Sequence, residues 1–203
     1  MKFVKPNLLI RSLYSSLIWK INTEEKVLYL TFDDGPIPEV TPWVLEQLRA
    51  YQAKATFFCV GENVEKHPEI FAQLKAEKHQ IGHHTYHHVN GWKTLNAAYY
   101  EEVKKGNAAA PSALFRPPYG KLKRAQIKQL KQEYKLIMWD VLSYDFDKDC
   151  SEEACFEQVR KNAGKGSIVV FHDSIKANKN LRYALPKTLE YFSRKGFRFE
   201  ALS

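Results

Sequence analysis

The sequence predicts an α/β protein with parallel strands, and three observations support this fold class. Short apolar runs alternate along the chain with longer segments that carry apolar residues at helical spacing. Such alternation is typical of parallel strands joined by crossover helices. The 203 residues, 44% hydrophobic and 27% charged, suffice for one domain with a substantial core, and we see no repeat or linker.

Apolar runs and amphipathic segments give the expected elements in chain order. The predicted strands are Val27–Phe32, Lys54–Val60, Gln80–Gly82, Ala113–Phe115, Lys135–Trp139, Ser167–Phe171 and Phe197–Glu200. The predicted helices are Glu39–Tyr51, Pro68–Glu77, Leu95–Gly106, Lys121–Glu133, Ser151–Ala163 and Leu181–Lys195. This alternation alone does not distinguish a barrel from an open sheet.

The first residues are expected to form an N-terminal extension, residues 1–25, ahead of a domain over residues 26–203. Apolar side chains at Leu13, Leu17 and Ile21 suggest an amphipathic helix that packs on the domain, with contact to a membrane surface as the alternative. The apolar stretch before them is interrupted by charged residues and a proline, and no small-residue cleavage site follows. It is a poor signal peptide and too short to span a membrane. The sequence therefore leaves the compartment open between the cytoplasm and a peripheral association with the cell envelope.

The net charge of +8 and the sequence pI of about 9.2 raise the question of an anionic partner. The lysines are scattered over predicted helices, however, and look like solvated helix faces. No recognition helix, RNA-binding motif or basic tail is visible, so we do not expect nucleic-acid binding.

The three cysteines, Cys59, Cys150 and Cys155, give neither a disulfide framework nor a metal-binding CxxC spacing. We expect free thiols, with a bridge between Cys150 and Cys155 as the alternative.

Two adjacent carboxylates, Asp33 and Asp34, follow the first predicted strand and precede Gly35-Pro36. A strand that stops there leaves both acids at its C-terminal end, where sites form in barrels and open α/β sheets. Burying two adjacent carboxylates is unfavourable unless a cation, a proton or strong donors compensate. The pair therefore raises the question of a metal site.

Four of the seven histidines lie in the run Gly82-His83-His84-Thr85-Tyr86-His87-His88. His84 and His88 are four residues apart, so on a helical turn they share one face, but His83 and His87 have the same spacing. Spacing alone does not choose between the pairs. Imidazoles with one carboxylate are a normal ligand set for zinc or a similar divalent ion. A His-rich surface turn without function is the alternative.

Three further segments complete a pattern. They are Arg116-Pro117-Pro118-Tyr119-Gly120, the stretch from Met138-Trp139-Asp140 to Ser143-Tyr144-Asp145-Phe146, and Ile168-Val169-Val170-Phe171-His172-Asp173. With them the chain resembles the polysaccharide deacetylases with a NodB-homology domain, carbohydrate esterase family 4. The five motifs of that family occur in order between Thr31 and His172. The resemblance implies a single-domain distorted (β/α) barrel with about seven parallel strands.

The resemblance also implies a metal site. The second family motif, His, then Ser or Thr, two residues and His, fits His84 and His88 and leaves His83 and His87 at variable positions. Asp34, His84 and His88 match the family's metal ligands. The expected ion is zinc, with cobalt, nickel or manganese as alternatives, because affinity order and availability decide together.

Catalytic roles follow from the same match. Asp33 matches the general base, and Arg116 matches the residue that orients and stabilises it, a task that suits a guanidinium fork. Tyr119 falls where the family uses a backbone N–H at the oxyanion. His172 matches the general acid, which suits the imidazole pKa, and Asp145 matches the carboxylate that holds it.

The departures from the family pattern are confined to the fourth motif, where Leu142 replaces an aspartate and Phe146 replaces a tryptophan. Phe146 keeps an apolar wall but lacks the indole N–H, which puts substrate preference in question. We expect substrate contacts from Phe146, Pro118 and Trp92, the last by stacking on a sugar ring.

The expected function is metal-dependent removal of the N-acetyl group from N-acetylglucosamine-type sugars of an acetylated glycan, with release of acetate. The first alternative is hydrolysis of another amide or of an O-acetyl ester on the same scaffold. The second is a glycan-binding homologue without turnover, but the usual sign of that, loss of the base or the acid, is missing.

Overall fold

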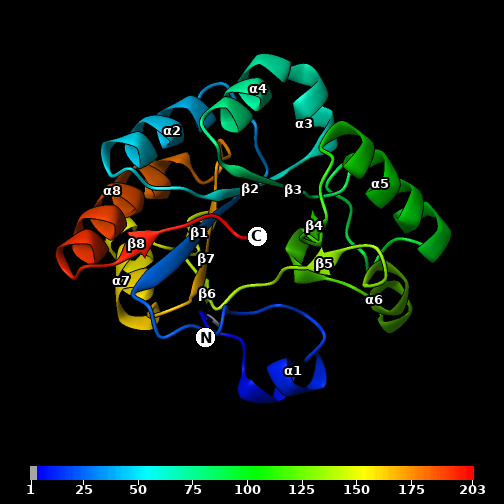
Figure 1. Ribbon diagram of the computed structural model, residues 1–203. Coiled ribbons are helices and arrows are strands. Elements are labelled where there is room, and N and C mark those ends of the chain that lie inside the picture. The colour runs from blue at the N-terminus through cyan, green and yellow to red at the C-terminus, as the bar shows by residue number, and fades with distance from the viewer. Residues whose placement is uncertain (1–3) are drawn as a thin grey trace.

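The computed structural model describes residues 4–203 (Figure 1). Met1 to Phe3, the start of the predicted extension, lie outside the described residues. The strands are β1 (Val27–Asp33), β2 (Thr56–Cys59), β3 (Gln80–His83), β4 (Leu114–Phe115), β5 (Lys135–Leu136), β6 (Val141–Leu142), β7 (Ile168–His172) and β8 (Arg198–Phe199). The helices are α1 (Leu8–Leu13), α2 (Thr41–Ala50), α3 (Gly61–Lys66), α4 (Pro68–Ala76), α5 (Asn96–Ala109), α6 (Arg124–Leu130), α7 (Glu152–Asn162) and α8 (Asn178–Arg194), with a 3₁₀ turn at Pro118–Gly120.

The strands form one sheet in the order β5-β4-β3-β2-β1-β7-β6, and β8 pairs with the first residues of β1. Every strand pairing in the described part of the chain is parallel. Helices α8, α2, α4, α3 and α5 follow one another in an arc around the outside of the curved sheet, with α7 beside α8 and α6 beyond α5 (Figure 1). This curled half-barrel confirms the predicted distorted (β/α) barrel.

The side chains of strand β1 point alternately to the two faces of the sheet, so β1 contributes residues both to the core and to the site. Leu28, Leu30 and Phe32 are fully buried in the large core cluster that includes residues of α2 and α8. The intervening side chains, Thr31 and Asp33 among them, face the other side of the sheet, because successive side chains alternate. The first acidic residue therefore belongs to the inner face of the half-barrel.

The two outermost strands, β5 and β6, leave a gap that the N-terminal segment covers. Ile18 pairs with Ile137 as an isolated parallel bridge, and Lys20 pairs with Ser167. Arg11 forms an ion pair with the buried Asp140 at 2.5 Å. We call residues 4–21 the N-terminal strap; Figure 1 shows it in dark blue beside the segment between β5 and β6.

The local predictions were wrong at three places. Helix α1 ends at Leu13, so Leu17 and Ile21 belong to an irregular and bridging segment rather than to one amphipathic helix. Helix α3 and strand β6 were not predicted, because six residues starting at a glycine and a two-residue strand carry too little periodicity. The remaining strands and helices were placed correctly to within a few residues, and all three cysteines are free and buried.

Within residues 4–203, every helix is too short or too polar to cross a lipid bilayer.

Candidate active site

The two adjacent aspartates occupy the end of β1 and point to different partners. Asp33 is 4% exposed, and Asp34, one residue later, has φ of 89°. Such left-handed backbone is unfavourable for a residue with a Cβ and persists only where the surroundings enforce it. The turn at Gly35 therefore needs an explanation in the neighbouring structure.

Asp173, which the sequence analysis did not single out, holds this turn. Its buried carboxylate accepts a hydrogen bond from the Gly35 N–H at 3.1 Å and from the Thr41 hydroxyl at 2.6 Å. A Cβ on Gly35 would lie 2.0 Å from Asp173 Oδ2, so only glycine fits here. Burial and the nearby Asp34 raise the pKa of Asp173 to about 8, although the two hydrogen bonds oppose the shift. The sequence signal was its place directly after His172.

Asp34, His84 and His88 converge on one point. Their ligand atoms all lie within 4.8 Å of one another, and His88 Nε2 lies 3.4 Å from Asp34 Oδ1. The two histidines do not share a helical turn: they lie in a loop after β3, with left-handed backbone at Thr85 and His88. The loop, rather than helical periodicity, brings the rings to 5.0 Å between centroids.

The other histidine pair lies elsewhere. His83 is fully buried, stacks on Phe115 at 4.7 Å and contacts the edge of Tyr134, and neither ring nitrogen has a hydrogen-bond partner in the described structure. His87 is half exposed and pairs with Glu102 at 2.7 Å. His83 is the last residue of β3, and His84 turns to the site, as successive side chains of a strand do.

His84 is held in the tautomer that a metal ligand requires. Its Nδ1 lies 2.6 Å from the backbone carbonyl of Arg116, which can only accept, so Nδ1 carries the proton and Nε2 keeps a lone pair. Burial and the neighbouring His88 hold the pKa of His84 well below its usual value. Burial also lowers the pKa of His88, although Asp34 opposes this. Two neutral imidazoles beside a carboxylate fit a divalent metal ion.

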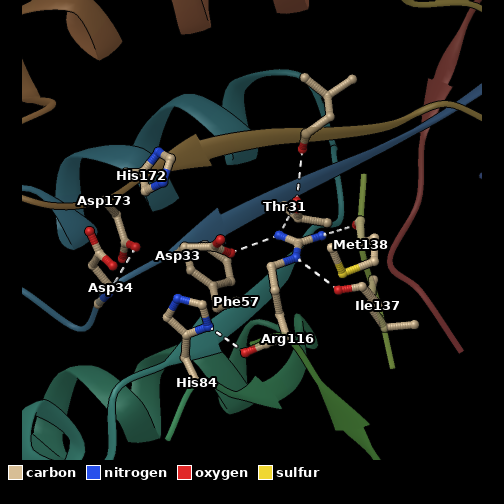
Figure 2. A network of polar contacts seen from close by, with 12 residues as sticks. Thr31, Asp33, Asp34, Phe57, His84, Arg116, Ile137, Met138, His172 and Asp173 are labelled. Atoms are coloured by element: carbon tan, nitrogen blue, oxygen red, sulfur yellow. Dashed lines mark hydrogen bonds and ion pairs between the residues drawn. The ribbon is translucent and has the colours of Figure 1, made fainter. Parts of the chain in front are cut away.

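Arg116 lies behind Asp33 in the interior of the half-barrel (Figure 2). The guanidinium is fully buried; its Nη1 donates to Asp33 Oδ1 and to Thr31 Oγ1, both at 2.7 Å. Its Nη2 donates to the Met138 carbonyl at 2.9 Å. Burial lowers the pKa of Arg116, and Asp33 opposes that shift. The pair thus fixes an aspartate at the site in a single orientation.

His172 ends β7, the strand next to β1, and Asp145 holds it from the loop after β6. His172 Nδ1 lies 2.8 Å from Asp145 Oδ1, and the His172 backbone N–H donates to Asp145 Oδ2 at 2.7 Å. Burial acts to lower the pKa of His172, but the carboxylate of Asp145 and those of Asp33 and Asp34 raise it to about 9. The imidazole therefore carries a proton at neutral pH.

These groups meet at a cavity of about 410 Å³, which we call the active-site cavity. Its polar wall contains Asp33, Asp34, His84, His88, His172 and Lys176. The rest of the wall is mostly apolar and is formed by Pro117, Tyr119, Gly120, Trp139, Leu142, Phe146 and Val170. Arg116 and Asp145 lie behind the wall. The structure thus brings together every predicted metal-ligating and catalytic residue.

Two of the three predicted substrate contacts are not part of this cavity. Pro118 is buried, and its neighbour Pro117 lines the wall instead. Trp92 is 57% exposed and lines an adjoining groove, where its indole N–H donates to the Leu122 carbonyl at 2.9 Å. Phe146 does line the cavity, with its ring centroid 4.8 Å from that of His172.

Comparison with known proteins finds similarity to deacetylases that act on glycans. The family model described as "Polysaccharide deacetylase" matches residues 20–136. A peptidoglycan-N-acetylglucosamine deacetylase of Bacillus cereus is 33% identical over 192 residues, which cover 91% of this chain and 90% of that protein. A chitooligosaccharide deacetylase of Azorhizobium caulinodans is 34% identical over 76% of this chain and 77% of its own length.

Solved structures agree with the sequence relatives. The crystal structure of a peptidoglycan N-acetylglucosamine deacetylase in complex with 4-naphthalen-1-yl-N-oxidanyl-benzamide matches with a TM-score of 0.87 and 31% identity, covering 97% of this chain and 95% of that one. A pseudoenzyme of carbohydrate esterase family 4 from Bacillus anthracis matches with a TM-score of 0.81 at 21% identity, which shows the shared fold alone. From the matched motifs, the barrel and these relatives, the chain belongs to the polysaccharide deacetylase family, carbohydrate esterase family 4.

Proposed function

We propose that the protein is a metal-dependent deacetylase that removes the acetyl group from N-acetylglucosamine-type residues of a glycan. The observation that carries the proposal is the convergence of three metal-binding side chains, a buried aspartate–arginine pair and a histidine–aspartate pair on one cavity. The named activities of the relatives, on peptidoglycan and chitooligosaccharides, support a glycan substrate.

Asp34, His84 and His88 would hold the divalent ion, zinc or else cobalt, nickel or manganese. When bound, such an ion lowers the pKa of water and polarises a carbonyl oxygen. The three donors leave room for further ligands, as catalytic sites require. A hydrogen bond from His84 Nδ1 to the protein backbone fixes the ring, which is the usual support for a ligating histidine.

Asp33 is the base that accepts the proton of the attacking water. Arg116 orients Asp33 through the 2.7 Å hydrogen bond to one carboxylate oxygen. Asp33 also lines the cavity. Attack of water on the acetamide carbonyl breaks the π bond and places negative charge on its oxygen. The Tyr119 backbone N–H, on a turn at the cavity wall, stabilises this charge.

His172 is the acid that releases the sugar amine. Collapse of the tetrahedral intermediate breaks the C–N bond, and protonated His172 donates its proton to the departing nitrogen. Asp145 keeps the imidazole protonated above neutral pH and turns Nε2 away from itself, because Nδ1 is taken by the hydrogen bond. The products are acetate and a free amine.

A different substrate on the same scaffold remains the second candidate, because Phe146 and Leu142 line the active-site cavity in place of the family's tryptophan and aspartate. This change alters the apolar wall near the reacting acetyl group. An O-acetyl ester or a non-sugar amide is therefore the alternative substrate.

Acetate release from N-acetylglucosamine oligomers by chelator-treated protein, with and without added divalent ions, tests the proposal. We expect release only with metal, and loss of about 10²–10⁴-fold in kcat for Asp33→Asn with metal binding retained. Asp149→Asn, an exposed residue away from the cavity wall, is the matched control and should keep full activity. Tight metal binding without acetate release from any sugar, but with turnover of small amides or esters, would favour the second candidate.

A further inference from the structure

A second hollow adjoins the active-site cavity. It has a volume of about 520 Å³, and we call it the aromatic groove. Tyr119, Trp139 and Phe146 line both spaces, so the two adjoin at these residues. Whatever is attached to a sugar whose acetamide lies beside Asp33 can extend from the cavity into this groove.

The N-terminal strap builds one wall of the aromatic groove. Ile10 and Tyr14, four residues apart, present one side of α1 and its C-cap to the groove, and Trp19 follows. Leu9 and Leu13 are 77% and 64% exposed and do not line it. The family model matches residues 20–136, so the strap residues of this wall lie outside the matched span.

The strap is fixed to the barrel, which makes the wall a defined surface. The Leu142 N–H donates to the Val4 carbonyl at 3.0 Å, and the Met138 N–H donates to the Ile18 carbonyl at 2.7 Å. The indole N–H of Trp19 donates to the backbone carbonyl of Tyr14 at 3.1 Å, which fixes the direction of the Trp19 ring.

Two further aromatic residues that line the groove are held in place but accessible. Trp92 is anchored by its hydrogen bond to the Leu122 carbonyl yet 57% exposed, and Tyr119 is 58% exposed. Among the described residues that line the groove, Lys121 carries the only charge, and it lies over the Trp92 ring at 4.0 Å. Rings with few charges suit a neutral ligand that offers C–H faces as well as hydroxyl groups.

We infer that the aromatic groove binds the sugar residue next to the one being deacetylated, and that Ile10 and Tyr14 of the N-terminal strap determine how strongly chain length affects turnover. This inference rests on the proposed function, since the neighbouring sugar reaches the groove only when the reacting sugar occupies the active-site cavity. A pyranose ring packs its apolar C–H face on an aromatic ring while its hydroxyl groups meet water and the tyrosine hydroxyls.

Kinetics on N-acetylglucosamine oligomers of increasing length test this inference. We expect Tyr14→Ala and Ile10→Ala each to lower kcat/KM on a pentamer about ten-fold, which corresponds to the loss of one packed side-chain contact. The same variants should stay within about two-fold of wild type on the shortest oligomer that is turned over, which also shows that they fold. Leu13→Ala, on the solvent side of α1, is the matched control and should leave both values unchanged.

An equal loss on short and long oligomers, or no loss on either, would overturn the inference while leaving the proposed function intact. If the wild type releases no acetate, the proposed function fails. Binding of the pentamer then tests whether the aromatic groove holds a sugar. Quenching of tryptophan fluorescence by the pentamer in Asp33→Asn, weakened when Tyr14→Ala is added and kept with Leu13→Ala, would still support the groove. Absence of quenching in Asp33→Asn would refute it.

Discussion

Replacement of His83 by phenylalanine tests the arrangement of the histidine run through the dependence of stability on pH. His83 lies fully buried between Phe115 and Tyr134 without a hydrogen-bond partner for either ring nitrogen, and burial lowers its pKa from 6.5 to about 3. A histidine with a depressed folded-state pKa binds its proton more readily in the unfolded chain. Stability from this residue is therefore full above about pH 6.5 and is lost as the pH falls toward 3.

The magnitude follows from the two pKa values. At pH 5.0 protonation stabilises the unfolded chain by RT ln(1 + 10^1.5), about 2 kcal/mol, whereas the folded state stays almost unprotonated. At pH 7.5 the same expression gives about 0.1 kcal/mol. The wild type therefore loses about 2 kcal/mol between these pH values through His83, and His83→Phe does not. The apolar ring also removes two buried polar atoms without partners, so we expect equal or higher stability at pH 7.5.

Urea unfolding of metal-free protein at pH 7.5 and pH 5.0 measures this difference. Other titrating groups contribute equally to both proteins, so the comparison isolates His83. His87→Phe, at a half-exposed position in the same run, controls for the addition of an apolar ring. An unchanged pH dependence in His83→Phe would show that the buried, neutral environment is wrong. Loss of metal binding at pH 7.5 would contradict the choice of His84 and His88 as ligands.

Three further substitutions probe the site itself. Arg116→Met leaves the base buried without its counter-ion, so we expect a loss of about 3–5 kcal/mol in urea unfolding together with loss of activity; less than about 1 kcal/mol would contradict this. Asp145→Asn removes the carboxylate that raises the pKa of His172 to about 9, so the alkaline limb of kcat/KM against pH should move down by at least about one unit, and an unmoved limb would exclude the assigned pair. Gly35→Ala places a methyl group against Asp173, and we expect weaker metal binding in calorimetric titration; wild-type affinity would mean that the turn does not hold its aspartate.

The motifs located the site because the end of a parallel strand fixes where its last side chains lie. Asp33 follows an apolar run that predicts a buried strand, so its place at the C-terminal end of that strand could be predicted from the sequence. The choice between His83 and His84 depended on the family motif, since both pairs have the same spacing. The loop that carries His88 was outside the reach of periodicity, because left-handed backbone at Thr85 and His88 has no apolar pattern.

Other features depend on contacts between distant segments, which one sequence does not display. Asp173 acts on Gly35 across 138 residues, and only the pairing of β7 with β1 brings them together. Trp92 was expected at the substrate, but its hydrogen bond to Leu122, from 30 residues away, sets it in the adjoining groove. The role of the N-terminal strap likewise depends on its contacts with distant residues beside the two edge strands, which the sequence does not display.

The strap also covers the two edges of the sheet. Strands β5 and β6 are the edges of the sheet, and an uncovered edge offers unpaired N–H and C=O groups to another chain. Ile18 occupies the Leu136 carbonyl and the Met138 N–H, and the Val4 carbonyl occupies the Leu142 N–H. A shortened protein beginning at residue 22 would expose these groups together with apolar side chains of the groove, and its first failing would be aggregation during expression rather than slow catalysis.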